Sequence, residues 1–307
     1  MEGVSFMLNF EFRVRARKAL QNHWQIALLI GLIAALPELL SQLVSALTGG
    51  SAAQRLTVLI ENDMNILYSN ERLASELQSI LNDQGFQWSA ILRVITWLVA
   101  PALSLGMTAY LLGLLRMQAG TVSSVFSRMK IWYKSIGLHI MTSLKAFLWA
   151  LPGIAVTIAT TFLLAYNVNS TEDLYSMVSW VNFLAYAGTL AAIIPMMLAL
   201  LRYAMASMVL ADEPSTGVMQ AIRRSKEMMK HQKGNFFLLM LSFVGWYLLL
   251  VLLEILLINM VGYVLASTIY MVLSLALNIY ITTTACAFYL NAKGESPVIV
   301  LENNTSI

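Results

Sequence analysis

"DEPSTGVMQAIRRSKEMMKHQKG", residues 212–234, is a charged stretch enclosed by two apolar ones. It holds five lysines and arginines, three acids and one histidine. "IIPMMLALLRYAMASMVLA" (193–211) precedes it and "NFFLLMLSFVGWYLLLVLL" (235–253) follows it. Apolar runs of about 20 residues joined by short basic connections are typical of a chain that crosses a lipid bilayer repeatedly.

The composition of the whole chain agrees with this interpretation. Of its 307 residues, 59% are apolar and only 11% are charged, whereas a soluble domain has about 25% charged residues. The single cysteine, Cys286, excludes an internal disulfide and a cysteine-based zinc cluster. We therefore expect an all-α membrane protein that forms one polytopic domain over residues 1–307.

Six stretches are long and apolar enough to cross the bilayer. Each must be a helix, because a span of about 20 residues in lipid has to satisfy its own backbone hydrogen bonds. The six are, approximately, residues 24–47, 89–115, 145–166, 176–201, 235–258 and 262–290. The first four contain Pro37, Pro101, Pro152 and Pro195, which permit kinks. These kinks indicate either irregular packing or hinges around a cavity.

Positive charge is concentrated on one side of this predicted topology. Of the 19 lysines and arginines, 15 fall in the N-terminal segment, the second-to-third and fourth-to-fifth connections, and the C-terminal tail. Because basic connections stay inside, both termini are predicted to be cytoplasmic. The external connection, residues 48–88, is acidic with helical spacing. It predicts amphipathic helices over the outer mouth, acting either as a surface cap or as a lid or docking element.

The basic connections resemble one another. "VSSVFSRMKIWYK" (122–134) aligns with "VMQAIRRSKEMMK" (218–230), and "FRVRARKALQNHW" (12–24) is a weaker third copy. The matched pairs include Phe126 with Ile222, Arg128 with Arg224, Lys134 with Lys230, and Arg15 with Lys226. The hypothesis is a unit of basic helix plus two-span hairpin, used three times, since repeats occur in membrane folds. Chance similarity between basic amphipathic stretches is the alternative.

Residues 214–231 are predicted to form an amphipathic helix on the inner leaflet. Pro214 suits its first turn, and an apolar face carries Val218, Ile222, Ser225 and Met229. We expect this face to lie in the membrane and the other to bind anionic lipid headgroups. The predicted lipid-binding residues are Arg223, Arg224, Lys226 and Lys230.

Three charged residues, Glu38, Arg93 and Glu254, lie inside predicted spans, all in the outer half of the bilayer. A charge at the bilayer centre costs about 2.5–3.5 kcal/mol on insertion scales unless it is paired or hydrated. The hypothesis is that Arg93 pairs with Glu254 or with Glu38. Structural pairing or snorkelling to water is one interpretation of this charge layer, and a polar substrate or proton site is the other.

Two segments resemble a known family. "FRVRARKALQNHWQIAL" (12–28) and, more closely, residues 202–250 are similar to bacterial integral membrane proteins of domain-of-unknown-function family 975. The matching positions are Arg15-Ala16-Arg17-x-x-Leu20, Tyr203, Ala211-Asp212-x-Pro214, Ala221, Ser225, Met229, Phe237, Leu241-Ser242-Phe243 and Gly245-Trp246. The resemblance implies a six-span bacterial membrane protein and no particular reaction, and residues 48–88 depart from it. A distant similarity to the membrane region of some glycerophosphodiester phosphodiesterases implies lipid neighbours.

No sequence motif typical of a catalytic or metal-binding site accompanies these spans. His23, His139 and His231 lie on different segments without metal-ligand spacing, and the basic residues follow lipid boundaries rather than a nucleic-acid surface. We expect no catalytic residues, metal or cofactor. The predicted function is a non-enzymatic structural or accessory component of the bacterial plasma (inner) membrane, linked to transport or envelope homeostasis. The alternative is a small-molecule permease with a cavity between proline-kinked spans.

Overall fold

A computed structural model describes residues 9–47, 84–118, 120–167 and 171–295, with positions 74, 75, 78, 79 and 82 between them. Every regular element in these ranges is a helix. The external segment at residues 48–88 lies largely outside the described residues. The all-α architecture expected from composition is therefore confirmed.

The described residues contain six membrane-length segments, as the hydropathy pattern predicts. They are α2 (Trp24–Leu47), α5 (Gln84–Leu115), α6 (Trp132–Asn167), α7 (Thr171–Tyr203), the pair α10 (Lys233–Leu241) and α11 (Val244–Val261), and α12 (Tyr263–Ala292). The helices α5 and α6 extend well beyond the predicted spans. At about 1.5 Å per residue, the 36 residues of α6 exceed one bilayer thickness.

The element order repeats three times along the chain. A short helix precedes each two-span hairpin: α1 (Asn9–Leu20), η2 (Val122–Ile131) and α9 (Val218–Met228). The second hairpin continues past α7 into one further short helix, α8 (Ala206–Asp212). The predicted unit of short helix plus hairpin is thus confirmed at the level of whole elements.

The residue-by-residue alignment of the repeats holds only in part: Val125 and Ala221, 96 positions apart, are both fully buried, but other pairs differ. Phe126 is 51% exposed, whereas its predicted counterpart Ile222 is 3% exposed. The reason is that η2 is a 3₁₀ helix, whose tighter winding places Val125 on the buried side instead. Arg15 and Lys226 differ in the same way, since Arg15 is buried and Lys226 is exposed.

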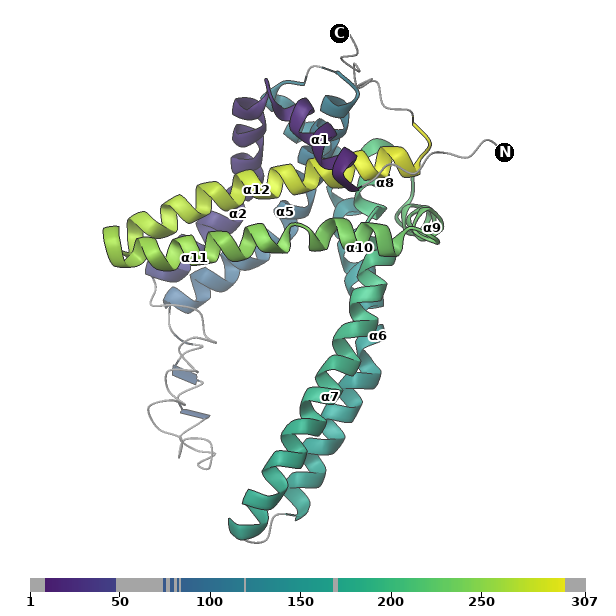
Figure 1. Ribbon diagram of the computed structural model, residues 1–307. Helices are drawn as coiled ribbons and strands as arrows, with labels where there is room; N and C mark the ends of the chain where they lie inside the picture. The colour runs from purple at the N-terminus through teal and green to yellow at the C-terminus, as the bar shows by residue number, and fades with distance from the viewer. Residues whose placement is uncertain are drawn as a thin grey trace, which may run out of the picture.

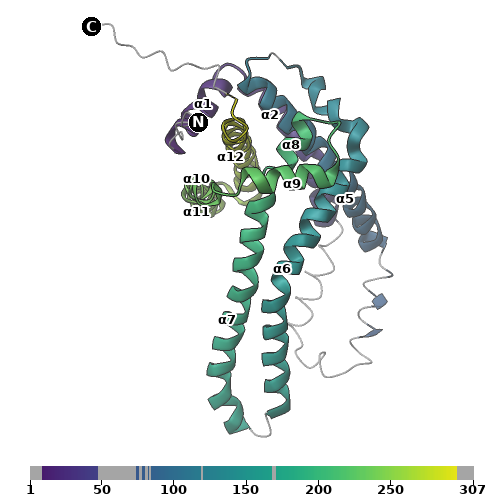
Figure 2. The same ribbon diagram turned by 90° about the vertical axis from the view of Figure 1, so that its right-hand side faces the viewer.

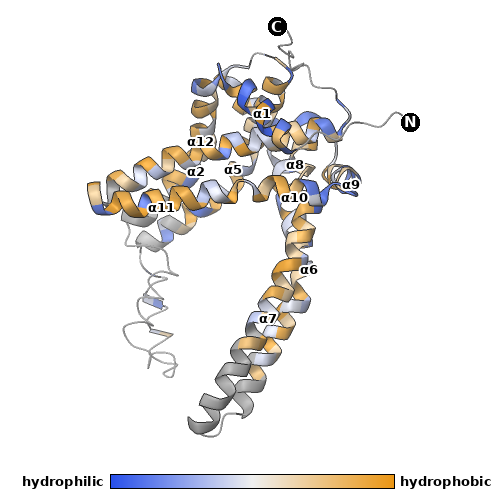
Figure 3. Cartoon of the chain, in the orientation of Figure 1, coloured by the Kyte–Doolittle hydropathy of each residue, from blue (hydrophilic) through white to orange (hydrophobic). Residues whose placement is uncertain are grey.

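The hairpins diverge from a common base (Figures 1 and 2). This base, which we call the charged base, consists of α1, η2, α8, α9 and the adjoining ends of the long helices. The α6–α7 hairpin runs away from the other two, and its contacts with them lie near the base. Hydropathy follows the same division, with largely apolar hairpins and hydrophilic residues gathered mainly on α1 and α9 of the base (Figure 3).

A cluster of buried aromatic side chains lies in the charged base. Phe288 of α12 packs against Phe12 of α1 and Phe236 of α10, with ring centroids 5.3 and 5.2 Å apart. Such tilted ring pairs add to the free energy gained by burial. This aromatic cluster joins the first repeat to the third.

Small residues allow the two helices of the α6–α7 hairpin to approach closely. A Cβ on Gly153 would lie 2.1 Å from the backbone nitrogen of Ala192, and one on Gly188 would lie 2.6 Å from Oγ1 of Thr157. Only glycine fits at such distances, as in other membrane helix pairs with small residues at their interface. The hairpin is therefore held together along its own length.

The fifth predicted span is broken, which the sequence did not predict. The first piece, α10, ends at Leu241 and α11 starts at Val244, with a turn at Ser242 and Phe243. Oγ of Ser242 donates to the carbonyl of Leu239 at 2.7 Å, a local bond that competes with regular helix. The four helices that contain proline, by contrast, continue through it.

Candidate functional site

The return helix of the first hairpin ends in the charged base with a defined cap. After Leu115, the amide of Met117 donates to the carbonyl of Leu114 at 3.1 Å, and the amide of Gln118 donates to that of Gly113 at 2.9 Å. This pair of bonds is the Schellman motif, and it places Arg116 at the C-cap. Met117 takes the left-handed position of the motif with φ 61°.

The return helix of the third hairpin ends in the same way. The amide of Gly294 donates to the carbonyl of Asn291 at 3.0 Å, and the amide of Glu295 donates to that of Leu290 at 3.0 Å. Gly294 has φ 83°, and Lys293 is the C-cap residue. Lys293 is therefore the structural equivalent of Arg116.

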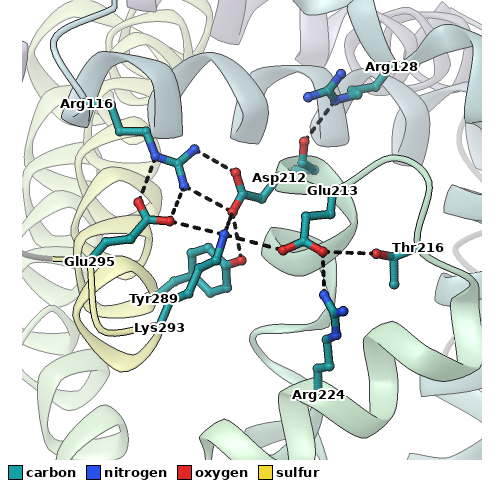
Figure 4. A network of polar contacts seen from close by, with 10 residues as sticks. Arg116, Arg128, Asp212, Glu213, Thr216, Arg224, Tyr289, Lys293 and Glu295 are labelled. Atoms are coloured by element: carbon teal, nitrogen blue, oxygen red, sulfur yellow. Dashed lines mark hydrogen bonds and ion pairs between the residues drawn. The ribbon is translucent and has the colours of Figure 1, made fainter.

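Both C-cap cations meet Asp212, the last residue of α8 (Figure 4). Nη1 and Nη2 of Arg116 donate to Oδ1 and Oδ2 of Asp212 at 2.6 and 3.1 Å. Nζ of Lys293 donates to Oδ2 at 2.6 Å, and the hydroxyl of Tyr289 donates to the same oxygen at 3.1 Å. One carboxylate from the second repeat thus binds cations from the first and the third.

Further ion pairs surround this centre. Glu295 accepts two bonds of 2.9 Å from Arg116 and lies 3.1 Å from Nζ of Lys293. Glu213, next to Asp212, pairs with Arg224 and lies 3.4 Å from Nζ of Lys293. We call this set the charge cluster: Arg116, Asp212, Glu213, Arg224, Tyr289, Lys293 and Glu295.

The loop that carries the two acids is fixed by the second repeat. Nε of Arg128 in η2 donates to the carbonyl of Ala211 at 2.9 Å. Nζ of Lys134 at the start of α6 donates to the carbonyls of Pro214, Ser215 and Thr216 at 2.8, 3.3 and 3.2 Å. Cations therefore cap the free carbonyls that follow the end of α8, as expected at a helix C-terminus.

The electrostatics of the cluster favour the ionised forms. The side chain of Asp212 is only 7% exposed, and this burial by itself raises its pKa. The hydrogen bonds from Arg116 and Lys293 outweigh burial and lower the pKa of Asp212 to about 2. The hydrogen bond from Arg224 likewise lowers the pKa of Glu213. Asp212 and Glu213 therefore act as charged anchors rather than as proton donors.

The helix predicted to bind lipid is present, but its first residue and the packing of its apolar face differ from the prediction. Helix α9 starts at Val218 with Gly217 as its N-cap, so the prediction that Pro214 lies in its first turn is wrong. Its apolar face packs on the protein: Ile222 and Met229 belong to the core, and Oγ of Ser225 donates to the carbonyl of Arg202 at 2.9 Å. This face is therefore held by protein contacts and does not lie in lipid as predicted.

The four cations predicted to bind lipid divide into two groups. Arg224 turns toward Glu213 and joins the charge cluster. Arg223, Lys226 and Lys230 are exposed. The exposed three remain a prediction of an anionic-lipid surface.

The three residues of the predicted intramembrane charge layer are not brought together by an ion pair. Oγ1 of Thr96 donates to the carbonyl of Pro37 at 2.9 Å, which sets Glu38 and Arg93 on neighbouring helices. Both are exposed, and Glu254 is half-buried on α11. In the described ranges no salt bridge joins Arg93 to Glu38 or Glu254.

A cavity of about 250 Å³ lies between α5, α6 and the α7–α8 junction. Pro101 lines it, together with the polar residues Ser104, Ser135, His139, Thr142, Tyr203 and Ser207. Close to it, Lys145 lies over the ring of Tyr203 and Arg202 over that of Trp149. Within the described part of the chain, no group of three or more His, Cys, Asp or Glu is placed to hold a metal ion.

Sequence reasoning missed the charge cluster as a unit. It used Arg116 and Lys293 only among the basic residues that orient the chain, and Asp212 only in the family motif and as a possible cap of the helix predicted at residues 214–231. A signal was present, because each of these residues follows the last apolar residue of a return span. Arg116 and Asp212 are also 96 positions apart, the same offset that aligns Arg128 with Arg224.

The chain belongs to the family described as protein of unknown function (DUF975), which matches residues 7–296. This confirms the resemblance carried by the two quoted segments. No curated protein and no solved structure matches the chain.

Proposed function

We propose that this member of the family is a non-enzymatic structural or accessory component of the bacterial plasma membrane, linked to transport or envelope homeostasis. The observation that best supports this proposal is the charge cluster, in which Asp212 binds Arg116 and Lys293 from two other hairpins. A site built of mutually paired charges positions helices. It offers neither the nucleophile next to a base nor the open metal position that catalysis requires.

The proposal places the charged base in the cytoplasm. Asn9 and Glu295, the first and last residues of the described ranges, both belong to this base. The basic residues also concentrate there. The exposed Arg223, Lys226 and Lys230 would then face anionic lipid, each contributing about 1 kcal/mol of attraction near the surface.

The orientation is tested by labelling Lys226→Cys on a Cys286→Ala background. Cys286 is buried, so the replacement removes only background reactivity. An impermeant thiol reagent should label Lys226→Cys only after the cells are permeabilised. Labelling in intact cells would place the charged base outside and contradict the proposed topology.

The accessory role is supported by the apolar surfaces of the diverging hairpins. Leu190 on α7 and Leu252 on α11 are both exposed, on helices long enough to lie in lipid. A photo-crosslinking residue is placed at each of these two positions, and Met219 on α9 serves as a control position in the base. In intact cells, at least one of the two hairpin positions should form a crosslink to a discrete membrane protein. Deleting that protein's gene should remove the adduct and reproduce the phenotype of losing this chain. Exclusively lipid adducts from both hairpins would contradict an accessory role.

The second candidate function is a small-molecule permease. The hydroxyl-rich cavity beside Pro101 favours it, because ligand sites in membrane helices combine irregular backbone with polar lining. Purified protein in liposomes would then accumulate a solute from a mixture of metabolites. Filling the cavity with Ser104→Leu should abolish this uptake, whereas Ser123→Leu in η2 should not. If wild-type liposomes take up nothing, the permease is excluded in favour of the accessory role.

A further inference from the structure

A second cavity, partly open and of about 320 Å³, lies at the joint between α1 and α2. Lys18, Ala19, Asn22 and His23 line it from the joint, and Leu114, Met117 and Gln118 line it from the end of α5. Its polar groups are an ammonium, an imidazole and two amides. None of the described aspartates or glutamates lines it, so Lys18 is the one charged side chain among the described lining residues.

Two polar groups of this cavity have no protein partner among the described residues. Nδ1 of His23 is buried without a hydrogen-bond partner. No salt bridge among the described residues engages Lys18. A buried ring nitrogen that makes no hydrogen bond destabilises the protein, and a ligand that reached it would remove this penalty.

Arg15 provides an independent observation on the same helix. It precedes Lys18 by three residues, about one helical turn, and is buried next to the cavity wall without itself lining the cavity. The residue is 5% exposed, and its Nε and Nη1 are buried without an acceptor. The carboxylate that acts on it electrostatically, Glu295, already accepts two bonds from Arg116. A buried guanidinium with free donors requires an anionic oxygen.

We infer that this cavity, the α1–α2 pocket, binds a phosphate group. Phosphate presents several acceptor oxygens to converging donors, and ammonium and guanidinium groups are its usual partners in proteins. Helix α2 starts at Trp24, next to His23, and the partial positive charge of its N-terminus adds to that of Lys18. The phosphate can belong to the headgroup of a phospholipid, since α2 is a candidate membrane span, or to a soluble phosphate ester.

This site is distinct from the exposed cations of α9 and does not depend on the proposed function. Its residues belong to α1, to the start of α2 and to the end of α5. It would give the protein a specific anion site beside Arg116, whose neighbours Met117 and Gln118 line the pocket. An occupied pocket would therefore stabilise the same end of α5 that the charge cluster holds.

The test uses the full-length protein in nanodiscs of phosphatidylcholine. Dioctanoyl phosphatidic acid and inorganic phosphate are titrated separately, and binding is followed by calorimetry and by thermal stability. We expect saturable binding of at least one of the two. Lys18→Gln and His23→Phe should each weaken it about tenfold or more, as loss of a charged or buried hydrogen bond does. Lys226→Gln, which removes an exposed cation of the same base, should leave it unchanged.

Arg15→Met separates a ligand-binding role from a structural one. Because the guanidinium has free donors without ligand, its replacement by a side chain of similar length should keep or raise the ligand-free melting temperature while weakening phosphate binding. A lower ligand-free melting temperature with unchanged binding would remove Arg15 from the site.

The two probes distinguish the sources of the phosphate. Binding of phosphatidic acid alone assigns the pocket to a lipid headgroup, and binding of inorganic phosphate as well assigns it to phosphate itself. Saturation by neither probe would overturn the inference. Equal losses in Lys18→Gln and Lys226→Gln would also overturn it, because they would reveal attraction to the charged base as a whole.

Discussion

Arg116 and Lys293 occupy the same C-cap position at the ends of α5 and α12, and both donate to the carboxylate of Asp212. The two donor–acceptor distances are 2.6 Å each. Asp212 ends α8, which follows the α6–α7 hairpin. A single buried carboxylate therefore links the return paths of all three hairpins, at the place where the diverging α6–α7 hairpin meets the other two.

Gly294 adopts a backbone conformation that is unfavourable for other residues, and the free-energy cost of replacing it can be measured. Its φ of 83° is one that side chains with a Cβ adopt at a cost of roughly 1–2 kcal/mol. Gly294→Ala should therefore lower the free energy of unfolding by about 1 kcal/mol in a detergent denaturation assay. Gly234→Ala is the control, because Gly234 has no such φ and nothing lies within 4 Å of an added Cβ. Equal effects of the two substitutions would show that the positive φ of Gly294 imposes no free-energy cost on alanine.

Gly153 sets the distance between α6 and α7. An added Cβ would lie 2.1 Å from the backbone of Ala192, so Gly153→Ala must force the helices apart. Overpacking of this kind costs roughly 1–3 kcal/mol, and thermal unfolding in detergent should report it. Gly245→Ala on α11 meets open space and should be neutral or stabilising, since alanine has the higher helix propensity. A neutral Gly153→Ala would contradict the close hairpin contact.

The charge cluster should make the protein sensitive to acid. The pKa of Asp212 falls from 3.8 to about 2 on folding, and that of Glu213 is also lowered. A depressed folded pKa gives stability that is present above the unfolded pKa and is lost as the pH falls through the folded one. The melting temperature should thus be level between pH 8 and 5 and fall below about pH 4. In Asp212→Asn the fall should be smaller, and an unchanged acid profile would contradict the account.

Arg93 and Glu254 should behave as independent residues. No salt bridge among the described residues joins them, and Arg93 is exposed. Stability effects of sites without shared partners add to within about 0.3–0.5 kcal/mol, so Arg93→Met and Glu254→Gln should be additive. The cycle is measured by thermal unfolding in detergent. A coupling free energy above about 1 kcal/mol would restore the hypothesis that they pair, which rests on their predicted depth in the outer half of the bilayer.

Hydropathy and charge were sufficient to predict the architecture. Helix α2 begins and ends where the apolar run does, at Trp24 and Leu47, because bilayer thickness fixes the length of a span. The order of basic helix, outgoing span and return span also follows from the sequence. The break at Ser242 and Phe243 did not, because no proline marks it, Gly245 lies two residues beyond it, and both neighbouring segments are apolar.

The candidate site was less predictable than the fold. Basic residues in the connections serve the topology as a group, so the pattern does not reveal which of them turn inward. Arg224 and Lys226 are equally basic in the sequence, yet Arg224 pairs with Glu213 and Lys226 is exposed. The difference arises from the direction in which α9 packs on the protein, and that depends on contacts with distant segments.

The central claim, that Asp212 holds the three hairpins together through the C-cap cations, is tested most directly by a double-mutant cycle of Asp212→Asn and Arg116→Gln. The free energy of unfolding would be measured in mixed micelles, with the exposed Glu227→Gln as the control. Removing one partner of a buried ion pair costs roughly 3–5 kcal/mol. The account predicts that each single variant approaches this loss, that the double variant loses clearly less than their sum, and that the control changes by less than about 0.5 kcal/mol. Additive effects, or single losses no larger than the control, would contradict it.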